Sequence, residues 1–153
     1  MTKQETAPDA PLFDLESAYL DIDAIEAGQW VPLGSEFPGL EVFTKGLTAS
    51  APKKLREQLE RTAPKSDRLS NGQLSENARD NILKTVIARR CISDWRGFAV
   101  KGKVLPFSIE TLESLLKEPR ARRIAAAIVG AILDLEQKTV EASDTVSGNS
   151  PAP

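Results

Sequence analysis

The chain has 153 residues, of which 20 are basic and 22 acidic, and its net charge of −2 gives no overall field to attract phosphates or an anionic membrane. We therefore expect no membrane partner, and nucleic-acid binding is disfavoured. The sequence has no histidine and only one cysteine, Cys91, so it lacks the commonest general base and metal ligand and cannot form an intrachain disulfide. These absences predict a protein that is not an enzyme and that uses no cofactor or metal.

The composition, 41% apolar and 27% charged, is that of a soluble globular protein of one domain. No apolar run approaches the roughly 20 residues of a membrane-spanning helix, and the first residues are too polar for a signal peptide, so we expect a cytoplasmic protein. Residues 1–11 and 141–153 are rich in proline and small polar residues, which predicts disorder. A single domain is expected over residues 12–140, with a hairpin region at 12–50 and a helical region at 51–140.

Two short segments with strand-forming residues, 26–33 and 40–47, flank a turn-rich stretch that contains Pro38 and Gly39. This arrangement predicts a β-hairpin. In the second segment apolar and polar residues alternate, although Phe43 falls on the polar side.

Four helices are predicted after the hairpin. The first begins near Pro52 with Ser50 as its cap, and the second begins at Ser75 and carries an apolar stripe through Cys91, with Trp95 one turn further on. The third begins at a cap on Ser108, and the last extends over 120–140. The expected fold is therefore mainly α with a small N-terminal β-hairpin (α+β), with about four helices in one domain.

No motif for catalysis or ligand binding is found. Cys91 lies on the apolar helix face, where a core thiol is expected to be inert. The acidic residues between Asp14 and Glu26 lack the glycine and closing glutamate of a calcium loop, so they are interpreted as solvated or as facing a partner. Arginines at 120–123 begin the last helix, where the helix dipole disfavours positive charge, which weakly indicates an anionic partner.

The last helix also carries small residues beside its isoleucine stripe, and Ala127, Gly130 and Ala131 are the partner-binding candidates. A glycine inside a helix costs roughly 0.5 to 1 kcal/mol relative to alanine, and close approach of another helix would offset that cost. Ordinary packing within the domain is the alternative explanation, and it is the favoured one.

An ordered set of residues resembles the tail assembly chaperones of long-tailed double-stranded-DNA phages and prophages. That family places a helix ending in Asp-Trp-x-Gly before a glycine turn and a Leu-Pro-Phe-Ser stretch, and its opening strand carries a tryptophan. The matching residues here are Trp30, Asp94, Trp95, Gly97, Gly102, Leu105, Pro106, Phe107 and Ser108. We interpret them as a structural corner, because the tryptophan buries a large surface and the glycines turn the chain.

The resemblance implies a non-catalytic chaperone that binds the tape measure protein and helps to recruit tail tube protein. Such a chaperone works in the host bacterial cytoplasm and is absent from the mature virion, and self-association is left open. Two alternatives remain at this point: a virion structural or tail connector protein, and a nucleic-acid-binding regulator.

Overall fold

The computed structural model describes residues 10–140. The predicted disorder at 1–9 and 141–153 therefore lies outside the described residues. The chain divides into two compact units, and the smaller one includes the described residues 10–21 and 138–140. It contains a 3₁₀ turn, η1 (Leu15–Ala18), and an antiparallel bridge between Leu20 and Thr139.

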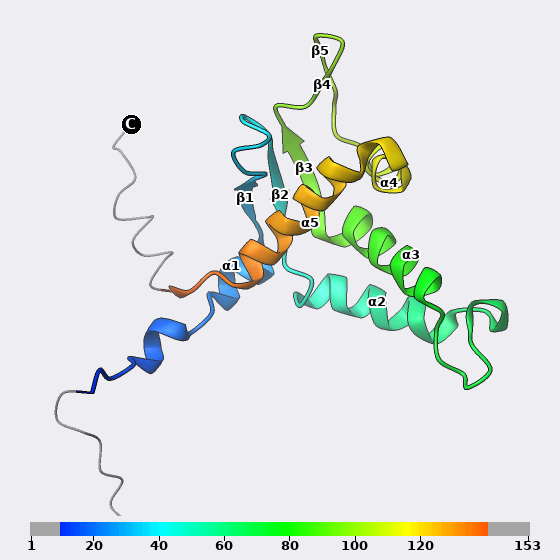
Figure 1. Ribbon diagram of the computed structural model, residues 1–153, viewed down its shortest axis with the longest axis horizontal. Coiled ribbons are helices and arrows are strands. Elements are labelled where there is room, and N and C mark those ends of the chain that lie inside the picture. Colours follow the sequence, from blue (N-terminus) through cyan, green and yellow to red (C-terminus); the bar gives the residue numbers. More distant parts are fainter. Residues whose placement is uncertain (1–9, 141–153) are drawn as a thin grey trace, which may run out of the picture. The chain divides into compact units, whose positions relative to one another are not determined.

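The larger unit spans Ile22–Gln137 and holds the α-helices and β-strands (Figure 1). Its elements in chain order are α1 (Ile22–Ala27), β1 (Gln29–Pro32), β2 (Glu41–Thr44), α2 (Ser50–Thr62), a 3₁₀ turn η2 (Lys65–Asp67), α3 (Glu76–Val86), a π-helical turn η3 (Ile87–Cys91), β3 (Ile92–Arg96), β4 (Ala99–Val100), β5 (Lys103–Val104), α4 (Ile109–Lys117), a 3₁₀ turn η4 (Pro119–Ala121) and α5 (Arg122–Glu136).

The three longer strands form an antiparallel sheet in the order β1-β2-β3. Its register places Val42 between Val31 and Trp95, and these side chains face the core. The neighbouring row, one residue along each strand, places Phe43 between Trp30 and Asp94 on the opposite face. Strands β4 and β5 form a separate two-stranded ribbon with a tight turn.

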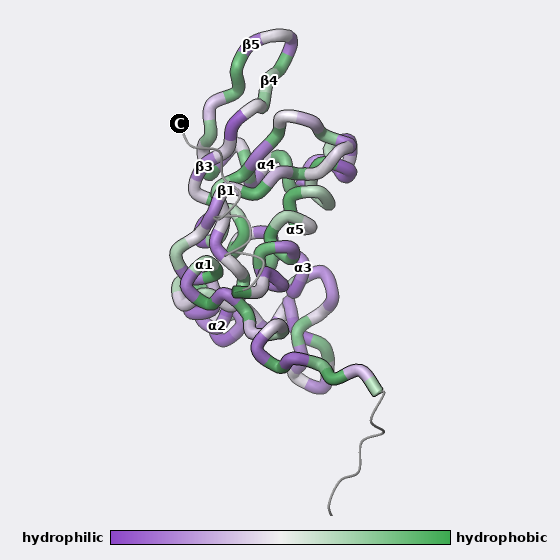
Figure 2. Tube along the Cα trace, turned by 90° about the vertical axis from the view of Figure 1, so that its left-hand side faces the viewer, coloured by the Kyte–Doolittle hydropathy of each residue, from purple (hydrophilic) through white to green (hydrophobic). Residues whose placement is uncertain are grey.

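Helix α5 lies against β1 and β2 and also contacts α1 and α4, while α2 lies beside α3 (Figure 1). Figure 2 shows hydrophilic colour along much of α2 and hydrophobic colour along α5, consistent with their different burial. Fully buried core side chains come from both helices and sheet: Val42, Val86, Ile87, Leu112, Ile128 and Ile132.

Serine caps begin two of the helices as predicted. Ser75 Oγ accepts the amide of Ala78 at 3.1 Å, and Ser108 Oγ accepts the amide of Thr111 at 3.0 Å. The expected cap on Ser50 is wrong, because α2 begins at that residue and has no side-chain cap of its own. The Glu26 carboxylate of α1 instead accepts the Ser50 amide at 3.0 Å, and this backbone hydrogen bond lowers the pKa of Glu26.

The expected fold, mainly α with a small N-terminal hairpin and about four helices, is wrong. The described part of the chain contains five α-helices, because α1 precedes the sheet. Strands also come from the middle of the chain, where β3 joins β1 and β2 in one sheet and β4–β5 adds a second. The structure is α+β, and no free-standing N-terminal hairpin is present among the described residues.

The end of α3 explains why β3 was mistaken for helix. The Ile92 amide donates to the Ile87 carbonyl, five residues back, and this π turn ends the helix just before the strand. Ile87, Cys91 and Trp95 are spaced by four, which is a helical period, yet Trp95 is buried from a strand. Spacing alone therefore favoured one long helix.

Gly97 is expected to be intolerant of a side chain. Its φ is +87°, and an added Cβ would lie 2.1 Å from the Gly39 carbonyl oxygen. The variant Gly97→Ala is expected to lower the free energy of unfolding by ~2–4 kcal/mol in urea titrations, from backbone strain plus the clash. Gly102→Ala is the control, since its φ is +79° but its surroundings are open. An equal loss in the two variants would contradict the role of the Gly39 contact.

Candidate functional site

Several of the residues that carry the chaperone resemblance lie around Trp95. Its ring stacks on Phe98 at 4.3 Å and meets Phe107 edge-on at 5.2 Å, and its Nε1–H donates to the Leu105 carbonyl at 2.8 Å. The Leu105 amide in turn donates to the Phe98 carbonyl at 2.9 Å. These contacts close the base of the β4–β5 ribbon, so the cluster is a structural corner.

The other matching residues have separate local roles. Asp94 lies on the opposite face of β3, and its carboxylate accepts the Trp95 amide at 2.8 Å. Gly102 follows Lys101 in the ribbon turn, where both residues have positive φ. Pro106 lies between Leu105 and Phe107 in the extended link to α4. The family's helix ending in Asp-Trp is not found, since both residues lie in a strand.

Trp30 does not join this cluster. It lies on the outer face of the sheet, where it meets Phe43 edge-on at 5.6 Å and the Arg96 guanidinium lies 4.1 Å from its ring centre. Glu41 holds that guanidinium through Nε at 2.9 Å and raises the pKa of Arg96. The residues that carry the resemblance therefore lie on both faces of the sheet, with Trp95 on the core face and Trp30 on the outer face.

An apolar groove lies between α3, α4, η4 and α5. It has a volume of about 390 Å³. Its lining residues are Asp80, Leu83, Lys84, Ile87, Leu116, Lys117, Glu118, Pro119, Arg122, Ala125, Ala126 and Val129. We call it the α5 groove.

The floor of the α5 groove is apolar and its rim carries unpaired positive charge. Leu83, Leu116 and Val129 supply aliphatic surface, and the small Ala125 and Ala126 leave room above α5. On the rim, Lys84 pairs with Asp80 at 2.8 Å and Glu118 pairs with Arg120. Within residues 10–140 neither Lys117 nor Arg122 has an ion pair, so both cations are available to a ligand.

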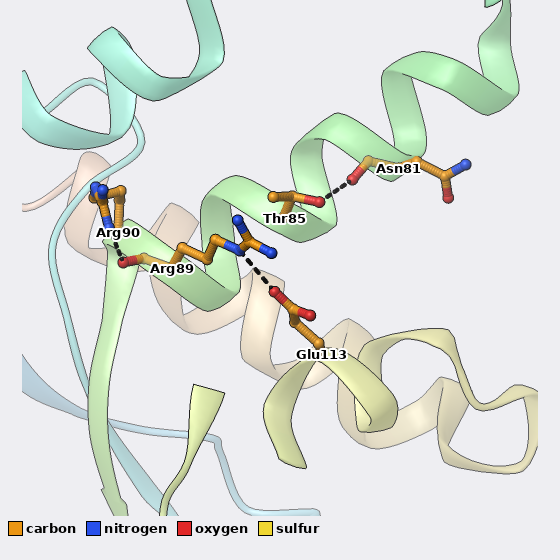
Figure 3. Close-up of polar contacts among 5 residues, drawn as sticks. All are labelled: Asn81, Thr85, Arg89, Arg90 and Glu113. Atoms are coloured by element: carbon orange, nitrogen blue, oxygen red, sulfur yellow. Dashed lines mark hydrogen bonds and ion pairs between the residues drawn. The ribbon is translucent and has the colours of Figure 1, made fainter. Parts of the chain in front are cut away.

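A polar contact joins the turn after α3 to α4 (Figure 3). Arg89, on the π turn that follows α3, donates from Nε to the Glu113 carboxylate of α4 at 2.9 Å. The Thr85 hydroxyl donates to the Asn81 carbonyl at 2.9 Å along α3, and Arg90 donates to the Arg89 carbonyl. The exposed Arg89–Glu113 pair contributes little stability by itself, but it fixes α4 to the turn that follows α3.

The sequence-based partner candidates fall beside the groove rather than in it. Ala131 is only 2% exposed and packs in the core, and Ala127 is partly buried against that core. A Cβ added at Gly130 would meet no atom within 4 Å, so that position is open. Ala125 and Ala126 belong to the same small-residue run but were not among the partner candidates, because which helix face is free depends on the packing of α3 and α4.

No helix in the described part of the chain is long and apolar enough to cross a membrane. Between residues 10 and 140 no cluster of three or more acidic or cysteine side chains is arranged to hold a metal ion.

Cys91 is expected to resist modification in the folded protein. It is 1% exposed, and burial, with a smaller contribution from Glu136, raises its pKa to about 12. The thiol therefore stays protonated at pH 8, and a thiol reagent such as DTNB is expected to react only after unfolding. The raised pKa contributes stability that is fully present below the ordinary thiol pKa and is lost as the pH rises toward 12. Rapid labelling without denaturant would contradict this assignment.

Trp95→Phe is expected to lower the free energy of unfolding by about 1–3 kcal/mol, because the Leu105 carbonyl loses its donor inside a packed cluster. Chemical denaturation of the variant measures this loss. Trp30→Phe is the matched control, since Trp30 is only half-buried and no side-chain hydrogen bond from it is found in the described region. An equal or larger effect at Trp30 would show that Trp95 does not anchor the corner.

A comparison with known families is consistent with a phage origin. The model of the family described as the YdaY prophage protein matches residues 47–149, which is more than half of the chain. No curated protein and no solved structure matches the sequence. The matched region includes α2 through α5, and therefore the Trp95 corner and the α5 groove. The chain belongs to the YdaY prophage protein family.

Proposed function

We propose that this prophage protein is a non-catalytic tail assembly chaperone whose α5 groove binds an amphipathic helix of the tape measure protein. The single observation that carries the proposal is the groove itself, with an apolar floor open to solvent between three helices. Grooves of this kind accept the apolar face of a helix through side chains spaced at i, i+3 or i+4 and i+7.

The chemistry of the groove suits reversible binding of a helix. Ala125 and Ala126 permit close approach to α5, and Leu83 and Val129 offer aliphatic contact on either side. Lys117 and Arg122 favour acidic residues flanking the apolar face of the client. A surface that combines modest apolar area with exposed charge favours an affinity from which the client can be released.

The resemblance around Trp95 favours the same role, and the family match supports a prophage origin. On this proposal the protein acts in the bacterial cytoplasm, helps to bring tail tube protein to the tape measure protein, and leaves before the virion is mature. Burial of the only thiol and its raised pKa fit a protein that needs no nucleophile.

Co-expression with the tape measure protein of the same prophage tests the proposal. The intact chain is expected to co-purify with it, and Ala126→Glu is expected to weaken recovery at least about tenfold, since a charge then enters the apolar floor. Ala126 is exposed and glutamate is a good helix former, so the variant is expected to fold. Lys103→Glu, on the β4–β5 ribbon, is the control for added negative charge.

Mass spectrometry of purified virions and of lysates provides the second arm. A chaperone is expected in lysates and absent from particles. Stoichiometric presence in particles would indicate a structural or connector protein instead. Unchanged co-purification of Ala126→Glu would remove the groove from the proposal.

A further inference from the structure

Charge is distributed very unevenly along this chain. Residues 4–44 carry nine acidic side chains and no basic one, whereas residues 45–140 carry 19 basic and 11 acidic ones. The net charge of −2 is therefore the sum of an acidic N-terminal part and a basic remainder. Opposite charges on one chain attract another copy as readily as they attract a different partner.

The acidic part includes a run of large apolar side chains that the described structure leaves uncovered. We call residues 11–20 the N-terminal segment. Leu12 is 84% exposed, Phe13 76%, Leu15 64% and Tyr19 50%. So many exposed large apolar side chains within one short stretch are uncommon on a monomeric protein and mark an interaction site.

The N-terminal segment has local order that suits docking. Asp14 caps the turn η1, with its carboxylate accepting the Glu16 amide at 3.1 Å and its carbonyl accepting the Ser17 hydroxyl at 2.6 Å. The bridge between Leu20 and Thr139 fixes the end of the segment. A turn that is already formed loses less conformational entropy on binding.

The α5 groove has the complementary chemistry. Its floor is apolar, and its rim presents Lys117 and Arg122, for which no ion pair is found in the described region. The segment alternates Leu12, Phe13 and Leu15 with Asp14 and Glu16, so apolar side chains and carboxylates reach a partner together. The apolar groups match the floor and the carboxylates match the rim.

We propose that the N-terminal segment of one copy occupies the α5 groove of a second copy. Each copy provides one segment and one groove, so a reciprocal exchange closes into a two-fold dimer. The inference goes beyond the proposed function and does not depend on it, because it concerns what covers the groove when no client is bound. Light scattering of the full chain is expected to give twice the monomer mass of 16.6 kDa.

Variants in the segment test which side chains hold the dimer. The double variant Phe13→Ser, Leu15→Ser is expected to raise the dimer dissociation constant by roughly a hundredfold or more, because each large apolar side chain that loses its burial costs about tenfold or more in affinity. Both residues are exposed, so folding is not at risk. Leu69→Ser is the control, since Leu69 is 51% exposed but does not line the groove.

Electrostatic complementarity is tested separately at the rim. Arg122→Glu is expected to weaken the dimer, whereas Lys103→Glu, which makes the same charge change away from the groove, is expected to leave it unchanged. Glutamate at the start of α5 is compatible with the helix dipole, so this variant is expected to fold. The wild-type dimer is also expected to weaken as salt is raised.

Disulfide trapping distinguishes two copies from one. A chain carrying Leu15→Cys is mixed with a chain carrying Ala126→Cys, so that a bond between these positions can form only between different molecules. Cys91 is buried and does not compete. A covalent dimer joined through Leu15→Cys and Ala126→Cys is expected, and substantially less product is expected when Leu69→Cys replaces Leu15→Cys.

Four outcomes would overturn the proposal. They are a monomer at every concentration, a dimer that the segment variant does not weaken, a dimer that Arg122→Glu does not weaken, and trapping no better than in the Leu69→Cys control. These outcomes are distinct from failure of the proposed function, which is judged by recovery of the tape measure protein.

Discussion

The π turn at Ile87–Cys91 is the constraint on which the rest of the larger unit depends. It ends α3 and starts β3 without an intervening loop, so one continuous stretch of chain belongs to both the helical layer and the sheet. Ile87, Ala88 and Cys91 are all buried within the turn, and Arg89 reaches α4 from its exposed side. Because the sheet and α4 are both fixed to this turn, α5 can pack against the strands and still leave the groove open beside α3.

The sequence predicted those parts of the fold whose signal is local. Ser75 and Ser108 were recognised as caps because capping requires only a hydroxyl before an apolar period. Strand β3 was missed because its buried and exposed residues do not strictly alternate: Ile92 and Trp95 are buried, while Ser93 and Asp94 between them are both exposed. The pairing of β3 with β2 is also irregular, with a bulge between Phe43 and Thr44. The short α1 was missed because six residues give too little periodicity to recognise. Pairing of β2 with β3 joins distant residues, which no local pattern specifies.

The sequence pointed to the last helix as a candidate binding element, but not to the residues of that helix that line the groove. Alanines and glycine in the last helix predicted a surface that another helix could approach, and this stays a prediction. The α5 groove is lined by other alanines of the same run, Ala125 and Ala126. Which of these residues face the core was decided by the rotation of α5 against β1 and β2, which buries Ala131 and leaves Ala126 exposed. Lys117 and Arg122 converge only because η4 reverses the chain between α4 and α5. Of the three arginines that looked unfavourable at a helix start, Arg120 pairs with Glu118 and Arg123 pairs with Glu36, so Arg122 is the one that lines the groove.

Both proposals use the same groove, and this shared use has a physical consequence. A client helix with acidic flanks competes for the same unpaired cations that attract Asp14 and Glu16 of a second copy. Exposed charges contribute modestly to affinity and are screened by salt, so neither occupant is held irreversibly. In the free protein the apolar groove would be covered, which protects it from non-specific association. A client whose apolar face fills the floor more completely than the N-terminal segment does would displace that segment, so client binding and dimer dissociation are coupled by mass action.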